Sequence, residues 1–221
     1  MNIEDFRRLR EQIGYTAEIS QREEYFRSVV LVLLIPVNGV YHFVFQKRCR
    51  NIRQGGELCF PGGRIDETDL SLQDTALRET TEELGIPKDK IEIIGRLNTI
   101  VAPMGAIIDA FVGIADVSEK DILPNPKEVE KIITLPVSYF MEHEPERYSA
   151  EVHVSPTHLD HETGEEAILL PAHELGLPDT YRKPWGGFRY SILVYKLPDE
   201  ILWGFTARLV NDFITRIKSK G

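Results

Sequence analysis

The sequence has few cysteines, no long apolar run and less positive than negative charge. Its two cysteines, Cys49 and Cys59, are too few for a disulfide framework, and their spacing is not Cys-x-x-Cys. The longest apolar run, residues 29–37, is interrupted by a proline and falls short of the about 20 residues that a membrane-spanning helix needs. The first residues mix charged and apolar side chains, unlike the continuous apolar segment of a signal peptide. We therefore expect a cytoplasmic protein with no membrane partner.

The net charge excludes one broad class of partner. The 221 residues include 26 Lys and Arg against 35 Asp and Glu, which gives −9 at pH 7. Loose nucleic-acid binding depends on a basic surface, so we expect no nucleic-acid partner. A small anionic ligand stays open if positive charge is concentrated locally or supplied by a metal. The composition is otherwise typical of a globular chain, and without repeats or linkers residues 1–221 are expected to form one domain.

Hydrophobic patterning and turn residues predict the elements of this domain. Strands are expected at residues 28–36, 40–45, 91–100, 107–114 and 189–196, and helices at 2–13, 71–84 and 203–218. The first helix is amphipathic and typical of a docking or dimer element. Asn38-Gly39 predicts a hairpin turn, and Gly85 is expected to end the helix at 71–84. The polar stretch at about 142–187 predicts a long insertion, either a hairpin or a lid.

Three carboxylates mark one face of the helix at 71–84. Glu79, Glu82 and Glu83 fall within a sector about 100° wide, and the opposite face is expected to pack. Carboxylates at this spacing repel one another unless a cation compensates them, and oxygen ligands suit Mg²⁺ or Mn²⁺. Arg78 is placed to reach Glu82 one turn along. The alternative is a solvated acidic face.

A glycine-containing loop and a basic cluster precede this helix. In Phe60-Pro-Gly-Gly63, the glycines let the backbone approach an ion or phosphate and offer a free carbonyl. The basic side chains between positions 47 and 64 are Lys47, Arg48, Arg50, Arg53 and Arg64. Only one acidic residue, Glu57, interrupts them, which reverses the local sign of charge. Arginine suits bidentate phosphate contacts, although any one of these side chains has pairing with surface acids as its alternative.

Residues 63–86 resemble the Nudix box, the Gly…Arg-Glu-x-x-Glu-Glu-x-Gly signature of diphosphate hydrolases. The interval between Gly63 and Arg78 is one residue longer than usual, and acids at positions 66, 67 and 69 stand near the missing mid-box glutamate. This variant, together with residues 44–63, resembles the coenzyme A pyrophosphatase branch of the family. The preceding motif is one residue short between Arg53 and Gly56. Segments 125–136 and 201–207 are also similar to that branch.

The resemblance implies a fold, a metal and a reaction. The fold would be α/β, with a mixed β-sheet sandwiched between helices (α/β/α). Mg²⁺ or Mn²⁺ would be held by Glu79, Glu82, Glu83 and the Gly63 carbonyl. Catalytic roles would fall to Arg78, Glu82 and Glu83, with Glu82 the first candidate for the base and Glu128 the second. Substrate would be bound by Arg48, Arg50, Arg53 and Arg64. The reaction would be cleavage of coenzyme A or acyl-CoA, with coenzyme A itself giving 3′,5′-ADP and 4′-phosphopantetheine, and a homodimer is an expectation by analogy.

Several alternatives stay open at this point. One alternative substrate is ADP-ribose or another nucleoside diphosphate derivative. Another alternative is a non-catalytic binding module of the same fold, which predicts that the box carboxylates are lost. Cys59 would be the reactive thiol of an isomerase, although a buried strand cysteine is favoured. A zinc site or a solvated loop would account for His153, His158, His161 and His173. Adenine stacking is a second role for Trp185, Tyr190 and Trp203, although a core position is expected for Trp203.

Overall fold

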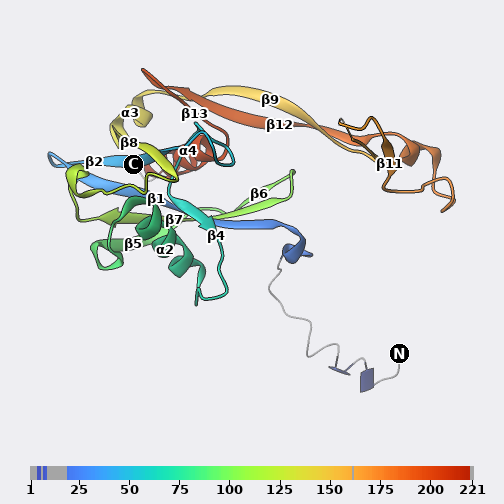
Figure 1. Ribbon diagram of the computed structural model, residues 1–221, viewed down its shortest axis with the longest axis horizontal. Helices are drawn as coiled ribbons and strands as arrows, with labels where there is room; N and C mark the ends of the chain where they lie inside the picture. The colour runs from blue at the N-terminus through green and yellow to red at the C-terminus, as the bar shows by residue number, and fades with distance from the viewer. Residues whose placement is uncertain (1–3, 6, 9–18, 161, 220–221) are drawn as a thin grey trace.

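The computed structural model describes residues 4–5, 7–8, 19–160 and 162–219 (Figure 1). The predicted helix at 2–13 lies mostly outside these residues. The helical segments are η1 (Arg22–Glu24), α2 (Leu72–Leu84), η2 (Lys88–Lys90), η3 (Glu119–Asp121), α3 (Val137–Glu142), η4 (Asp179–Arg182) and α4 (Gly204–Lys218). The main sheet contains β1 (Phe26–Val37), β2 (Val40–Arg48), β3 (Leu58–Cys59), β4 (Gly62–Arg64), β5 (Ile91–Arg96), β6 (Ile100–Ala102), β7 (Ala106–Ala115) and β8 (Val129–Pro136).

The main sheet is mixed and is built around β1. Its central order is β3-β2-β1-β7-β5, with β4 beside β1, β6 beside β7 and β8 beside β2. The long β1–β7 pair is parallel, whereas the other pairs are antiparallel. Asn38 and Gly39 both have positive φ angles, 50° and 80°, which is the geometry of a tight β1–β2 hairpin. The predicted turn is therefore confirmed.

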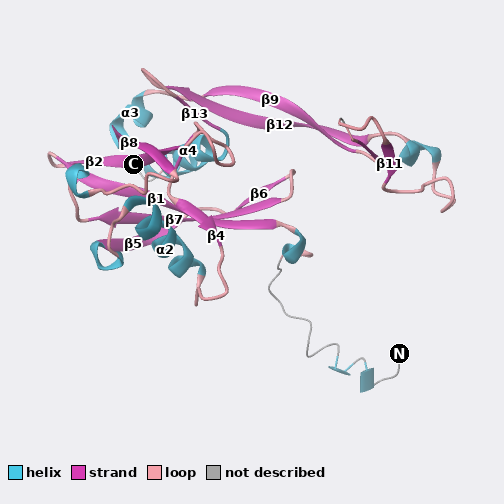
Figure 2. Cartoon of the chain, viewed as in Figure 1, coloured by secondary structure: helices cyan, strands magenta, loops and turns pink. Residues whose placement is uncertain are grey.

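The alternation of β1 divides the core into two layers. Val29, Leu31 and Leu33 pack in the cluster that contains residues of α2, whereas Val32 and Leu34 pack in the cluster that contains residues of α4. Both faces of the sheet are thus covered by a helix, and Figure 2 shows α2 and α4 on opposite sides of it. The predicted α/β/α arrangement with a mixed sheet is confirmed.

Two element boundaries differ from the sequence expectation. The predicted strand at 91–100 is interrupted after Arg96, because β5 and β6 pair with different parts of β7 and a bulge falls between Ile93 and Gly95. The closing helix begins at Gly204, since Trp203 belongs to a short strand that pairs with Val194. Trp203 is 43% exposed, so its expected core position is wrong.

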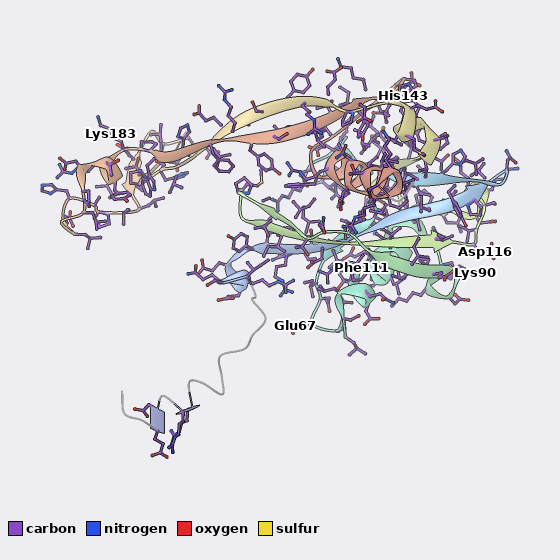
Figure 3. The ribbon with its side chains drawn as sticks, turned by 180° about the vertical axis from the view of Figure 1, so that it is seen from behind. Glu67, Lys90, Phe111, Asp116, His143 and Lys183 are labelled. Carbon is purple, nitrogen blue, oxygen red and sulfur yellow. The ribbon has the colours of Figure 1, made fainter. Side chains whose placement is uncertain are left out.

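The predicted insertion at 142–187 forms most of a long two-stranded arm. Its strands β9 (Glu146–Val154) and β12 (Trp185–Lys196) pair antiparallel, and β13 (Ile201–Trp203) joins them near the body. The short pair β10 (Thr157–Leu159) and β11 (Glu166–Ile168) lies toward the far end. In Figure 3, Lys183 marks that end and His143 marks the base of the arm. Among the described residues, no helix is both long and apolar enough to cross a membrane.

Candidate functional site

The local sequence determines where α2 begins and ends. The Ser71 hydroxyl oxygen caps the helix by accepting the Asp74 backbone N–H at 3.2 Å, and the hydroxyl donates to the Asp74 carboxylate at 2.8 Å. Gly85 ends the helix in the left-handed region, with φ at 68°, and its N–H donates to the Thr81 carbonyl. The three box glutamates consequently lie in the second half of a helix with well-defined ends.

Glu83 lies against the sheet. Its carboxylate accepts the Gly62 N–H of β4 at 2.9 Å, and Arg48 lies 3.9 Å away. Burial raises the pKa of Glu83 to about 7, although hydrogen bonds from Gly62 and Gln46 oppose the shift. The expectation that only the opposite helix face packs is wrong in this respect. Glu83 shares the buried side of α2, because β4 provides a backbone donor for it.

The Glu79 carboxylate lies directly against Gly63, where only a residue without a side chain leaves room for it. A Cβ at Gly63 would lie far inside van der Waals distance of the Glu79 carboxylate. Gly63 pairs with Val29 in β1, which fixes the β4 backbone beneath the helix. Burial raises the pKa of Glu79, and Arg78 acts in the opposite direction. Glycine is therefore needed at position 63 for this carboxylate to meet β4.

Arg78 connects the glutamates to the loop before the helix. Its Nη1 donates to Glu79 Oε1 at 2.8 Å and to Glu82 Oε2 at 3.2 Å. Its Nε and Nη2 donate to Asp69 at 3.0 and 2.9 Å, and Nη2 also donates to the Arg64 carbonyl at 3.0 Å. The Arg78 bonds hold the pKa of Asp69 well below its usual range. The sequence analysis assigns no role to Asp69, although its position near the missing mid-box glutamate points to this part of the site.

The donor set fits a hard divalent cation. The predicted ligands are carboxylate or carbonyl oxygens, and the bare Gly63 lets a carboxylate approach the strand backbone. Glu82 is the accessible member, with 58% of its side chain exposed. In the part of the chain that the structure describes, no three Asp, Glu, His or Cys side chains converge as a preformed cage. Arg78 instead bridges Glu79 and Glu82.

Three of the four predicted substrate arginines gather beside this site. Arg48 Nε donates to the Arg53 carbonyl at 3.1 Å. The guanidinium groups of Arg53 and Arg64 each lie 5.1 Å from the centre of the Phe26 ring. Arg50 is exposed in the same loop. Phe26 was missed from sequence, because only the pairing of β1 with β4 brings it next to arginines far along the chain.

Histidines and aromatic residues of the arm lie apart from the box glutamates. His153, His158 and His173 are exposed, and His153 Nε2 lies 3.4 Å from Glu151. His161 lies outside the described residues. Trp185 packs edge-on against Tyr181, with ring centres 5.3 Å apart. Tyr190 lies closer to the body, where the Arg208 guanidinium is 4.9 Å from its ring centre.

Cys59 has the surroundings of a structural thiol. It lies in β3, where Gln46 of β2, a fully buried residue, donates to its sulfur at 3.6 Å. Burial raises the pKa of the Cys59 thiol to about 11, and the nearby Glu83 adds to the shift. A thiolate is the nucleophilic form, so this environment argues against Cys59 as a reactive group.

We expect Cys59 to resist alkylation in the folded protein. Relative to a solvated cysteine with an ordinary pKa of 9.0, its thiolate fraction at pH 8 should be about 100-fold lower. Mass spectrometry after timed iodoacetamide treatment would compare Cys59 with Cys49, and a urea-unfolded sample would serve as the control. Equal labelling of both cysteines in the folded protein would contradict the structural role.

Comparison with known proteins assigns the chain to a family. The NUDIX domain family matches residues 24–152. Human mitochondrial coenzyme A diphosphatase NUDT8 is 26% identical over 211 residues, covering 94% of this chain and 75% of the relative. Mouse peroxisomal coenzyme A diphosphatase NUDT7 is 34% identical over 113 residues, covering 51% of this chain and 48% of the relative, so the chain spans about half the length of that protein.

A solved structure, that of a C. elegans Ap4A hydrolase binary complex, has a TM-score of 0.44 and 16% identity to this chain, covering 52% of this chain and 83% of its own. The family match, by contrast, extends over more than half of the chain and includes both β4 and α2. The protein therefore belongs to the Nudix hydrolase family.

Proposed function

We propose that this Nudix hydrolase cleaves the diphosphate bond of coenzyme A or acyl-CoA, and that with coenzyme A it releases 3′,5′-ADP and 4′-phosphopantetheine. The observation that carries the proposal is the position of the box glutamates against β4, beside the Arg48, Arg53 and Arg64 cluster. Coenzyme A carries a 3′-phosphate in addition to its diphosphate, and a group of arginines suits that extra charge. The names of the human and mouse relatives support the same substrate.

Mg²⁺ or Mn²⁺ is the proposed cofactor, with Glu79, Glu82, Glu83 and the Gly63 carbonyl as its ligands. When bound, such an ion neutralises charge on the phosphates and lowers the pKa of water. The chain itself fixes the ligands, because Gly62 orients Glu83 and Arg78 holds Glu79 and Glu82. Arg78 is anchored in turn by Asp69, so it acts as a positioning residue.

Glu82 is the proposed general base, which takes a proton from the attacking water at its carboxylate oxygen. It is the most exposed of the three glutamates, and Arg78 contacts only one of its two oxygens. Glu128 is the second candidate, since it lies near enough to Glu79 to raise the pKa of that group. Arg48, Arg50, Arg53 and Arg64 are proposed to hold the phosphates of the substrate.

ADP-ribose is the second candidate substrate, favoured by the shortened loop between Arg53 and Gly56. Gln54 and Gly56 both take positive φ angles there, 57° and 83°, so the loop turns sharply beside the arginines. The non-catalytic alternative has no comparable support, because Glu79, Glu82 and Glu83 are all present. The cytoplasmic location and the homodimer stay predictions, and the names of two relatives place those proteins in mitochondria and peroxisomes.

Product analysis tests this proposal. The full chain is incubated with coenzyme A and Mg²⁺, with ADP-ribose in parallel, and the products are separated by anion exchange. We expect 3′,5′-ADP to form faster than ADP-ribose is cleaved, and EDTA to abolish the reaction. Cleavage of ADP-ribose with coenzyme A untouched would refute the substrate assignment while leaving the box chemistry. Equal product formation in EDTA would refute the metal requirement.

A further inference from the structure

We infer that a cleft between the arm and the main sheet binds the nucleobase of the substrate, an inference that rests on the proposed function. This arm cleft is lined by Glu24 and Tyr25 at the end of η1, by the end of β6 and the turn into β7, and by Phe188 and Tyr190 of β12; the residues from β6 and its turn are Val101, Ala102, Pro103 and Gly105. Figure 1 shows that turn rising from the sheet toward the arm. Its volume of about 420 Å³ lies within the roughly 300–1,000 Å³ of small-molecule sites.

The side chains of the arm cleft suit a planar aromatic ligand. Phe188 is 49% exposed on the arm, and Val101 across the cleft is also 49% exposed. An aromatic ring and an apolar side chain left open to solvent provide surfaces on which a base can stack. The Tyr190 hydroxyl oxygen is buried without a hydrogen-bond partner in the protein. A polar edge of a base entering the cleft would provide that partner.

The charge distribution separates the base from the phosphates. Glu24 is the one charged side chain among the residues that line the arm cleft, and the Arg208 guanidinium against the lining Tyr190 ring balances it, so the cleft has no excess of positive charge. Positive charge lies next to the cleft instead, where Arg53 and Arg64 flank the Phe26 ring. A nucleotide would therefore place its phosphates on the arginines and its uncharged base in the cleft.

A continuous set of contacts joins the box to the arm cleft. Arg64 follows Gly63 in β4 and reaches Phe26 through its guanidinium group. Phe26 follows Tyr25 in the chain, and its N–H donates to the Gly105 carbonyl of the cleft at 2.8 Å. Side chains alternate between the two faces of β1, and Phe26 is an even number of residues from Val32 and Leu34, which pack with α4. Phe26 therefore lies on the sheet face opposite α2. Among the described strands β4 pairs only with β1, so a substrate held at the glutamates would pass around the free edge of β4 to reach Phe26 and the arm.

The test measures binding of 3′,5′-ADP to the full chain by isothermal titration calorimetry, which requires no hydrolysis. Phe188→Ala should raise Kd about tenfold through the lost stacking surface, and Tyr190→Phe about threefold through the lost hydroxyl. Tyr148→Ala is the matched control, because it removes a ring that is 52% exposed on the same arm but outside the cleft. Binding of inorganic pyrophosphate with Mg²⁺ should be unchanged in all three variants.

Several results would overturn the inference. The first is wild-type affinity for 3′,5′-ADP in both cleft variants, and the second is an equal loss in Tyr148→Ala. Weaker binding of coenzyme A alone, with 3′,5′-ADP unaffected, would assign the cleft to the pantetheine half instead. Failure of the proposed function would give a different result. If the wild-type chain binds 3′,5′-ADP through Phe188 but does not cleave coenzyme A, the cleft is still a nucleobase site and the proposed hydrolysis is refuted.

Discussion

Glu83→Gln is expected to lower kcat by about 10³-fold, the scale seen when one group that stabilises transition-state charge is removed. The substitution keeps the shape of the side chain and an oxygen that accepts the Gly62 N–H. It removes the negative charge that a divalent cation would need at this buried position. Steady-state turnover of coenzyme A with Mg²⁺ measures the effect.

In the presence of EDTA, the same substitution is expected to raise the Tm of the protein. Burial raises the pKa of Glu83 from 4.5 to about 7, so the folded protein resists its ionisation more than the unfolded chain does. Stability from this group is therefore present below pH 4.5 and lost as the pH rises through 7. A glutamine cannot ionise, so Tm should exceed the wild-type value at pH 8, and the difference should narrow toward pH 4.5.

Glu67→Gln is the control for both effects. Glu67 lies exposed in the loop before α2, where Figure 3 labels it. We expect wild-type turnover and Tm from this variant. If Glu83→Gln still cleaves coenzyme A at a substantial rate, Glu83 is not needed for catalysis. If its Tm at pH 8 is lower than that of the wild type, the charge of Glu83 is compensated in the folded protein.

Gly63→Ala should separate activity from stability in a second way. The added methyl group would collide with the Glu79 carboxylate, which is the far end of a flexible side chain and can move away. Folding should therefore be little affected, whereas displacement of Glu79 by about 1 Å should cost about 10²-fold in kcat/KM. Parallel measurements of kcat/KM and Tm would test this.

The neighbouring glycine gives the opposite expectation. In Gly62→Ala the methyl group would meet the Val29 carbonyl of the sheet backbone, which cannot move aside cheaply, so Tm should fall. Gly95→Ala is the neutral control, because nothing lies within 4 Å of a Cβ at that position. Full activity in Gly63→Ala would show that Glu79 does not need its place against β4.

The sequence predicts the features that depend on short-range physics. Ser71 and Gly85 cap α2, and Asn38-Gly39 has the backbone angles of a tight hairpin. The box motif alone indicates the three glutamates and the glycine-containing loop that precedes them. The continuous apolar run at 29–37 predicts β1 as a buried strand, although its two faces could not be assigned to partner helices.

Contacts between distant segments were decided only by the tertiary structure. Asp109 is buried in β7, where Arg22, Arg96 and Thr99 bind its carboxylate, and no local pattern marks these residues as partners. The helical periodicity placed Glu83 with exposed carboxylates, whereas the Gly62 N–H draws it into the interior.

Spacing along the chain thus predicts which residues carry the chemistry, because helix ends, tight turns and motif intervals are local. The pairing of β1 with β4 and β7, and the return of the arm over the sheet, decided which side chains meet. The arginines at Phe26 and the cleft shared by Tyr25, Val101 and Tyr190 exist because strands far apart in sequence hydrogen-bond side by side, and no local pattern encodes that register.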